Sequence, residues 1–253
     1  MIIVISPAKT LYDHSPVELE QFTEPVFITE AEKIISVLKK KKPDQLANLM
    51  DISPKLAELN YHRFQAWKPS HSENAWQALL MFHGEVFQGI KAETFSASEF
   101  EFAQHHLRIL SGVYGLLKPL DLIQPYRLEM GTPINIASKK NLYEFWKTKI
   151  TNQLNEDLVL KGQTTLINLA SKEYFSAINT GKLKAKVITP SFKETKNGQY
   201  QMISIFAKKA RGLMTRFIIQ NNISDPEEIK AFDLEGYFFN NHLSKGNDWV
   251  FTR

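Results

Sequence analysis

The chain has 253 residues, of which 43% are hydrophobic and 23% charged, a balance that is ordinary for a soluble globular protein. It contains no cysteine, which excludes disulfides, thiolate metal sites, iron–sulfur clusters and any cysteine-based peroxidase. Lysine and arginine exceed aspartate and glutamate by 31 to 27, so nucleic-acid binding requires that the positive charges cluster. Because no stretch is apolar enough to span a membrane and no signal peptide is evident, we expect a cytosolic protein without a membrane partner.

The first half of the chain predicts one buried strand followed by several helices. Met1–Ile5 is uniformly apolar, which is typical of a buried strand. Thr29–Glu32 has the pattern of a capping box, and the lysines of Lys39–Lys42 suit the end of the helix that it would open. Pro43 can begin the next helix, and the pair Ser53-Pro54 predicts the start of a third.

The second half predicts strands and helices in no regular alternation. Ser96–Glu99 again has the pattern of a capped helix start. Asn141–Leu158 has the periodicity of a long amphipathic helix, whereas Thr164–Leu169 is rich in β-branched and apolar residues and predicts a buried strand. Asn197-Gly198 predicts a tight hairpin turn between strands at 191–195 and 200–206.

These elements indicate the fold class. The chain has no internal repeat, no low-complexity tract and no glycine- and serine-rich linker that would separate domains. We therefore expect a single compact α+β domain over residues 1–253, built around a mixed β-sheet with flanking helices.

A basic segment follows the predicted hairpin. In the helix expected over 207–217, the apolar residues Phe206, Ala210, Leu213 and Phe217 share one face. The other half carries four cations with no anion between them: Lys208, Lys209, Arg211 and Arg216. Positive side chains at a helix start attract phosphate, since the helix dipole is positive there too. A solvated surface face explains the pattern equally well.

Two glycines, Gly112 and Gly115, bracket an apolar pair and allow a tight turn whose backbone N–H groups could meet an anion. Such a turn occurs in helix-hairpin-helix elements that bind DNA, and Lys118 could complete the phosphate contact. Residues 107–110 could also form a strand. An ordinary structural turn is the favoured interpretation of this pattern.

Two polar segments are candidates for catalysis or binding. In the segment 121–131, Tyr126 could stack on a base and Arg127 could pair with a phosphate, or Arg127 could simply pair with Glu129. In the segment 168–175 a buried strand ends in polar residues, as at many ligand sites. Its three candidates are Asn168, Ser171 and Glu173, although Ser171 as a helix cap and Glu173 as a first-turn acid are the slightly favoured alternative.

The motifs of several enzyme and metal-site classes are absent from the sequence. The seven histidines show no spacing typical of a metal site: His14, His62, His71, His83, His105, His106 and His242. No Walker A loop, dinucleotide-binding fingerprint or G-x-S-x-G elbow occurs. We therefore expect neither a metal site nor a cofactor.

Seven stretches spread over the chain carry a resemblance to a known family: Ile5–Leu11, Leu110–Gly115, Pro119–Leu122, Gln124–Gly131, Ile167–Ser171, Phe206–Met214 and Glu235–Phe238. They follow one another in the order of that family and together extend over the whole chain. On these residues the chain closely resembles the peroxide-stress protein YaaA family, formerly a domain of unknown function.

The resemblance implies more than the residues alone do. It implies a single α+β domain with a positively charged cleft, a helix-hairpin-helix element, and binding of DNA, including branched or unpaired forms. It also implies a role in surviving hydrogen peroxide by limiting free intracellular iron. Carried over to this chain, the cleft comprises Lys9, Lys118, Arg127, Lys208, Lys209 and Arg211, and the hairpin comprises Gly112, Val113, Tyr114 and Gly115.

Three hypotheses follow. The first is an oxidative-stress protein that binds the DNA backbone without strong sequence preference, the same residues alternatively holding a small anionic ligand. The second is an enzyme acting on a nucleic-acid base or nucleotide in the same cleft, with Asn168, Ser171, Glu173, Tyr126 and Glu129 as candidate catalytic residues. The third is an iron-handling protein, which only the resemblance suggests.

Overall fold

The strand β1 (Ile2–Ile5) lies in the middle of the main sheet and is buried along its whole length. It pairs in parallel with β5 (Leu107–Ser111) on one side and with β8 (Thr165–Leu169) on the other. The predicted first strand is therefore confirmed, and its sequence is apolar throughout because both of its faces are covered.

The computed structural model describes residues 1–12, 15–17, 19–69 and 74–253.

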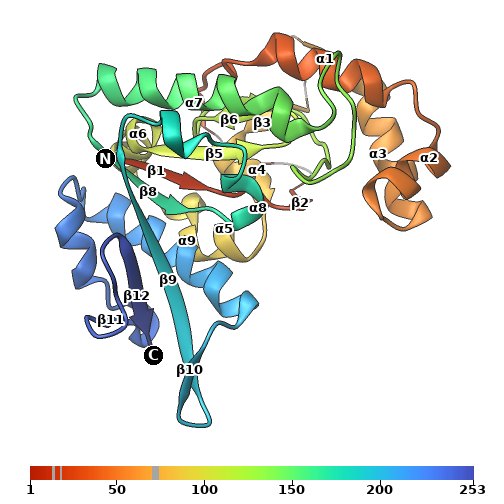
Figure 1. Ribbon diagram of the computed structural model, residues 1–253. Helices are drawn as coiled ribbons and strands as arrows, with labels where there is room; N and C mark the ends of the chain where they lie inside the picture. Colours follow the sequence, from red (N-terminus) through yellow and green to blue (C-terminus); the bar gives the residue numbers. More distant parts are fainter. Residues whose placement is uncertain (13–14, 18, 70–73) are drawn as a thin grey trace.

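The main sheet mixes parallel and antiparallel pairs and runs in the order β11-β12-β9-β8-β1-β5-β6. The pairs β9 with β8 and β9 with β12 are parallel, whereas β6 and β11 join the two edges in antiparallel fashion. The long strand β9 runs beyond the end of β8 and turns into the short strand β10 (Figure 1). The remaining strands of this sheet are β6 (Gly115–Leu117), β9 (Lys186–Lys196), β10 (Gln199–Gln201), β11 (Phe238–Phe239) and β12 (Asp248–Thr252).

Helices flank this sheet, so the predicted α+β class with a mixed sheet is confirmed. In Figure 1 the long helix α7 lies above the strands β1, β5 and β8, and α5 and α9 lie below these three strands. The longer helices are α1 (Ile28–Leu38), α2 (Pro43–Met50), α3 (Pro54–Ala66), α6 (Ala97–His106), α7 (Leu142–Leu160) and α9 (Ser204–Gln220). The short ones are α4 (Ala78–Met81), α5 (Glu85–Ile90) and α8 (Lys172–Phe175). Two strand pairs lie outside the main sheet: β2 (Thr10–Leu11) with β4 (Phe82–His83), and β3 (Trp76–Gln77) with β7 (Leu122–Ile123).

Helix starts were predictable where a side chain caps the helix. Ser53 and Ser96 accept hydrogen bonds from the third residue along, and Asn141 does the same for α7. The predicted capping box at Thr29 is wrong. The helix α1 already begins at Ile28, so Thr29 lies within its first turn and no side chain caps the helix.

The hairpin at Asn197-Gly198 is confirmed, and both residues have the positive φ that a tight turn needs. Its second strand is shorter than expected, because β10 ends at Gln201 and α9 begins at Ser204. Consequently Phe206 belongs to the first turn of α9 and is exposed, although the sequence pattern placed it on the apolar face.

The predicted helix-hairpin-helix element is wrong. Gly112 and Gly115 lie in the turn between β5 and β6, so strands and not helices flank them. The turn is buried: the indole Nε1 of Trp146 donates to the carbonyl of Gly112 at 2.9 Å, and the Tyr114 hydroxyl accepts from Trp67 at 2.9 Å. The turn is therefore packed inside the protein, and the Tyr114 backbone N–H donates to the Ser111 hydroxyl at 2.9 Å, as the structural-turn interpretation expected.

The helices α5 and α9 cross at glycines. A Cβ atom on Gly212 would overlap the backbone carbonyl of Val86, and one on Gly89 would overlap that of Lys209. Glycine is required at this crossing because the two backbones touch where a side chain would have to stand. The crossing fixes how α9 is placed against the segment that leads into α5.

We expect Gly212→Ala to destabilise the protein by about 3 kcal/mol, because the added methyl group forces the two helices apart. Gly181→Ala is the matched control, since a Cβ atom there meets its nearest neighbour, Asn179, only at 3.5 Å. Urea denaturation of the two variants and the wild type measures the difference. Equal stability of both variants would contradict a tight glycine crossing.

A buried carboxylate, Asp121, ties the segment after β6 to the N-terminal region. It accepts hydrogen bonds from the Thr23 hydroxyl at 2.6 Å and from the Lys118 backbone N–H at 2.8 Å. Burial raises the pKa of Asp121 from its ordinary value of 3.8 to about 6. Its contribution to stability is therefore fully present below about pH 4 and is lost as the pH rises through about 6.

Relative to Asp121→Asn, which does not titrate, the wild type should lose about 3 kcal/mol of unfolding free energy between pH 4 and pH 7. The measurement is urea denaturation of both proteins across that range. The difference between the two curves, and not either curve alone, isolates Asp121 from the other carboxylates. Parallel pH profiles for wild type and variant would contradict the raised pKa.

Candidate functional site

The chain leaves β1 and β8 at the same edge of the sheet, because these neighbouring strands are parallel. Ser6 follows the first strand and Ser171 follows the second. The Ser6 hydroxyl accepts a hydrogen bond from the Ser171 backbone N–H at 2.8 Å and donates to the Ser171 hydroxyl at 3.3 Å. These bonds hold the two strand ends side by side and form the floor of a cleft.

This strand-end cleft has a volume of about 450 Å³. Four parts of the chain line it: residues 6–10 after β1, residues 83–87 at the start of α5, residues 169–174 after β8, and Lys208 with Arg211 on α9. Its size falls within the range of roughly 300–1,000 Å³ that is typical of small-molecule sites. The strand-end cleft is thus the place where the segments 5–11, 167–171 and 206–214 of the sequence meet.

Two of the predicted phosphate-binding residues share one carboxylate partner beside the cleft. Lys9 Nζ lies 2.6 Å from one carboxylate oxygen of Glu129, and Arg127 lies 3.2 Å from the other. The alternative interpretation of this segment, a loop pinned by an Arg–Glu pair, is therefore confirmed for Arg127. The Nε atom of Arg127 is buried and finds no hydrogen-bond partner in the described part of the chain.

Two other cations keep their charge available. Arg211 lines the strand-end cleft and is half-buried, and burial lowers the pKa of its guanidinium from the ordinary value. An arginine nonetheless stays protonated at neutral pH. Neither Arg211 nor the exposed Lys208 has a carboxylate partner among the residues that the structure describes. A ligand with negative charge would meet two uncompensated cations here.

Several candidate catalytic residues already make hydrogen bonds within the protein. Ser171 caps α8, and Glu173 accepts a hydrogen bond from the Gly131 backbone N–H at 3.0 Å, although both line the strand-end cleft. Asn168 accepts from the backbone N–H of Ala170 at 3.1 Å, just behind the strand end. The hydroxyl of Tyr126 is buried and bonded to Ser111 at 2.6 Å, so its ring cannot stack on a base in this conformation.

The structure does not bring the remaining predicted residues to the cleft. Lys209 points away and pairs with Glu235 at 2.6 Å, and Lys118 borders a separate small hollow near Asp121. Arg216 donates to the carbonyls of Ile90 and Lys91. Because α9 begins at Ser204, the cations lie beyond its first turn, and the predicted help from the helix dipole is wrong. Gly112, Tyr114 and Gly115 lie in the buried turn.

The sequence analysis missed the segment 83–87, which forms one wall of the strand-end cleft. Two glycines offered a signal. A Cβ atom on Gly84 would lie 3.2 Å from the Cβ of Ala8, and Gly89 permits the crossing with α9. Close backbone approach is a frequent reason for glycine, but the sequence does not say which segment approaches.

In the part of the chain that the structure describes, no group of three or more histidine, aspartate or glutamate side chains is placed to hold a metal ion. His14 and His71 lie outside the described residues. None of the described helices is both long and apolar enough to cross a membrane.

If Glu129 offsets the positive charge of Lys9 and Arg127, Glu129→Gln should raise the affinity for an anion by about 1 kcal/mol, or roughly fivefold in Kd. Glu227→Gln is the control, since it removes the same charge from an exposed pair with Lys230 elsewhere on the surface. Calorimetric titration with inorganic phosphate compares the two. An equal effect of both substitutions would indicate net charge alone and contradict a local role.

The chain is similar to known proteins over nearly its whole length. The family described as peroxide stress protein YaaA matches residues 1–243. A UPF0246 protein of Colwellia psychrerythraea is 52% identical over all of this chain and 99% of its own length. A UPF0246 protein of Neisseria gonorrhoeae (strain ATCC 700825 / FA 1090) is 50% identical over all of this chain and 98% of its own length. The chain therefore belongs to the peroxide stress protein YaaA family.

Proposed function

We propose that this member of the peroxide stress family binds DNA at the strand-end cleft, with a phosphate held between Lys208 and Arg211 and without strong sequence preference. The observation that carries the proposal is the half-buried guanidinium of Arg211, which lines the cleft without an acidic partner in the described residues. A planar guanidinium binds phosphate in bidentate fashion, and contacts of this kind read no bases.

The charges around the cleft favour a local phosphate site over a broad basic track. Its lining holds three cations, Lys9, Lys208 and Arg211, and two carboxylates, Glu85 and Glu173. Lys9 is in turn paired with Glu129 outside that lining. The formal excess of positive charge is therefore small, and attraction depends on where the two unpaired cations stand.

The size of the cleft indicates which form of DNA it would take. A volume of about 450 Å³ holds a group of nucleotide size, whereas a base-paired duplex is too wide to enter it. An unpaired strand, a chain end or the open arm of a branch can present a single phosphate to Arg211. We therefore expect DNA with unpaired nucleotides to bind more tightly than plain duplex.

A second candidate function is an enzyme acting on a base or nucleotide in the same cleft. It is favoured by the convergence of Ser6, Ser171, Glu173 and Lys9 at the ends of two parallel strands. Ser171 and Glu173 also have a structural role, because both already accept hydrogen bonds from backbone N–H groups. Turnover of a nucleotide by the wild type, lost in Lys9→Met but not in Lys209→Met, would favour this candidate.

The same proposal suggests how the protein contributes to peroxide resistance. Without cysteine it has no thiol to reduce peroxide, so protection of DNA is the role we propose. Limiting free iron, which the family resemblance implies, would then involve other proteins or a site not formed by the described histidines and carboxylates.

The test is a salt titration of binding to single-stranded, four-way-junction and duplex DNA, comparing wild type with Lys208→Ala/Arg211→Ala. We expect the double variant to bind at least tenfold more weakly, with a log–log salt slope smaller by about 1–2 because two phosphate contacts are gone. Lys209→Ala is the matched control, since its side chain lies on the same helix but pairs with Glu235. A loss of affinity in Lys209→Ala as large as that in the double variant would contradict a site at the cleft.

A further inference from the structure

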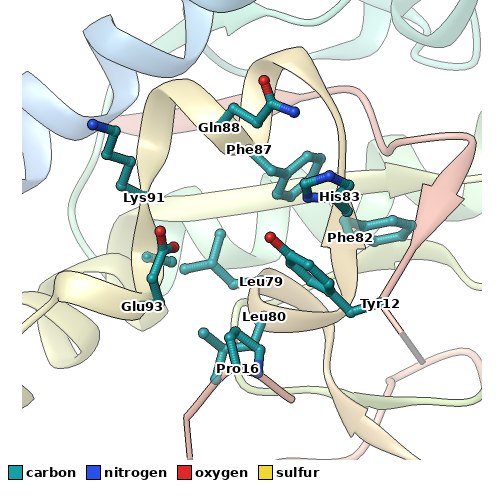
Figure 2. A pocket seen from close by; sticks show the side chains of 11 residues that line it. Tyr12, Pro16, Leu79, Leu80, Phe82, His83, Phe87, Gln88, Lys91 and Glu93 are labelled. Atoms are coloured by element: carbon teal, nitrogen blue, oxygen red, sulfur yellow. The ribbon is translucent and has the colours of Figure 1, made fainter. Parts of the chain in front are cut away.

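A second cavity adjoins the strand-end cleft and has a volume of about 150 Å³. Figure 2 shows it from close by, with the rings of Tyr12, His83 and Phe87 on one side and Lys91 and Glu93 on the other. We call it the aromatic hollow. Nothing in the proposed phosphate site uses it.

Secondary structure fixes the aromatic side of this hollow. The strands β2 and β4 pair Thr10 with His83, and the Tyr12 backbone N–H donates to the Met81 carbonyl at 2.9 Å. These bonds bring the Tyr12 and His83 rings to a centroid distance of 4.3 Å at an angle of 45°. Tyr12 is about one-third exposed, so part of its ring surface is open to a further ring. Flat aromatic surfaces of this kind stack nucleobases.

The hollow also has polar side chains without a partner among the described residues (Figure 2). The side chains of Gln88, Lys91 and Glu93 make no hydrogen bond or ion pair with the residues that the structure describes. An amide supplies both a donor and an acceptor, an ammonium only donors and a carboxylate only acceptors. Together they match the mixed donor and acceptor edge of a base better than they match a hydrocarbon or a simple anion.

The aromatic hollow lies next to the strand-end cleft. His83 and Phe87 line both, and the short helix α5 separates the polar groups of the hollow from Arg211. A helix with its side chains is about 10–12 Å wide, which is the order of the reach of one nucleotide from phosphate to base edge. A ligand with a phosphate at one end and a planar ring at the other therefore has the length to place one end in each.

From this arrangement we infer that the aromatic hollow binds the pyrimidine base of an unpaired nucleotide whose phosphate lies at Lys208 and Arg211. The single ring follows from the volume, since a cavity of about 150 Å³ accommodates a ring of benzene size. Tyr12 and His83 supply the stacking surface, and Gln88 reads the base edge. The phosphate end of this inference rests on the proposed function, whereas the base end rests on the hollow alone.

Calorimetric titration of the full chain tests this inference. The ligands are dCMP, dTMP, dAMP, dGMP, deoxyribose 5-phosphate, inorganic phosphate and the nucleosides deoxycytidine and thymidine. We expect dCMP or dTMP to bind at least tenfold more tightly than deoxyribose 5-phosphate and several-fold more tightly than the purine nucleotides. Tyr12→Ala should weaken the pyrimidine nucleotides about tenfold through lost stacking and leave inorganic phosphate unchanged. Tyr200→Ala, at another exposed tyrosine, is the control.

The outcomes separate the two proposals. Equal affinity for deoxyribose 5-phosphate and the nucleotides, or tighter binding of purines, would overturn the base pocket and leave the phosphate site standing. Nucleoside binding that Tyr12→Ala abolishes, without any binding of phosphate, would support the pocket and overturn the phosphate site. Failure of every ligand to bind would overturn both.

Discussion

The contact on which the candidate site depends is the crossing of α5 and α9 at Gly89 and Gly212. The two helix backbones touch there, so α9 cannot shift without opening the packing against Val86. This contact sets Arg211 beside the segment 83–87 and near the ends of β1 and β8. Two segments separated by more than a hundred residues thereby become opposite walls of one cleft. Glycine packing thus places the two cations of α9 at the same cleft as the strand ends.

The charges then divide into two kinds. Glu129 pairs with both Lys9 and Arg127, which fixes these side chains in place and offsets part of their positive charge. Arg211 and Lys208 have no such partner among the described residues, so their charge is not offset by an ion pair. Half-burial strengthens the attraction of Arg211 for an anion, because a less polar surrounding screens charge less than water does. One side of the cleft thus supplies shape and the other supplies attraction.

Much of the fold could be predicted because the signals are local. Caps at Ser53 and Ser96 and the turn at Asn197-Gly198 depend on a few adjacent residues. The error at Gly112 arose because a glycine-bracketed turn joins two strands as readily as two helices, and only pairing across the sheet decides. Among the candidate site residues, Lys9, Ser171, Glu173, Lys208 and Arg211 do line one cleft. Which cations are neutralised could not be predicted, since Glu129 and Glu235 are distant in sequence from Lys9 and Lys209.

The most direct test of a phosphate site at the α5–α9 crossing is a crystal structure of the chain with a short single-stranded DNA of mixed sequence. A phosphate oxygen within hydrogen-bond distance of the Arg211 guanidinium, with Lys208 on the same phosphate or its neighbour, is the predicted result. A strand that runs past Lys118 or Lys209 and leaves the cleft without a phosphate would contradict it. Glycine packing would then have shaped the cleft for another ligand.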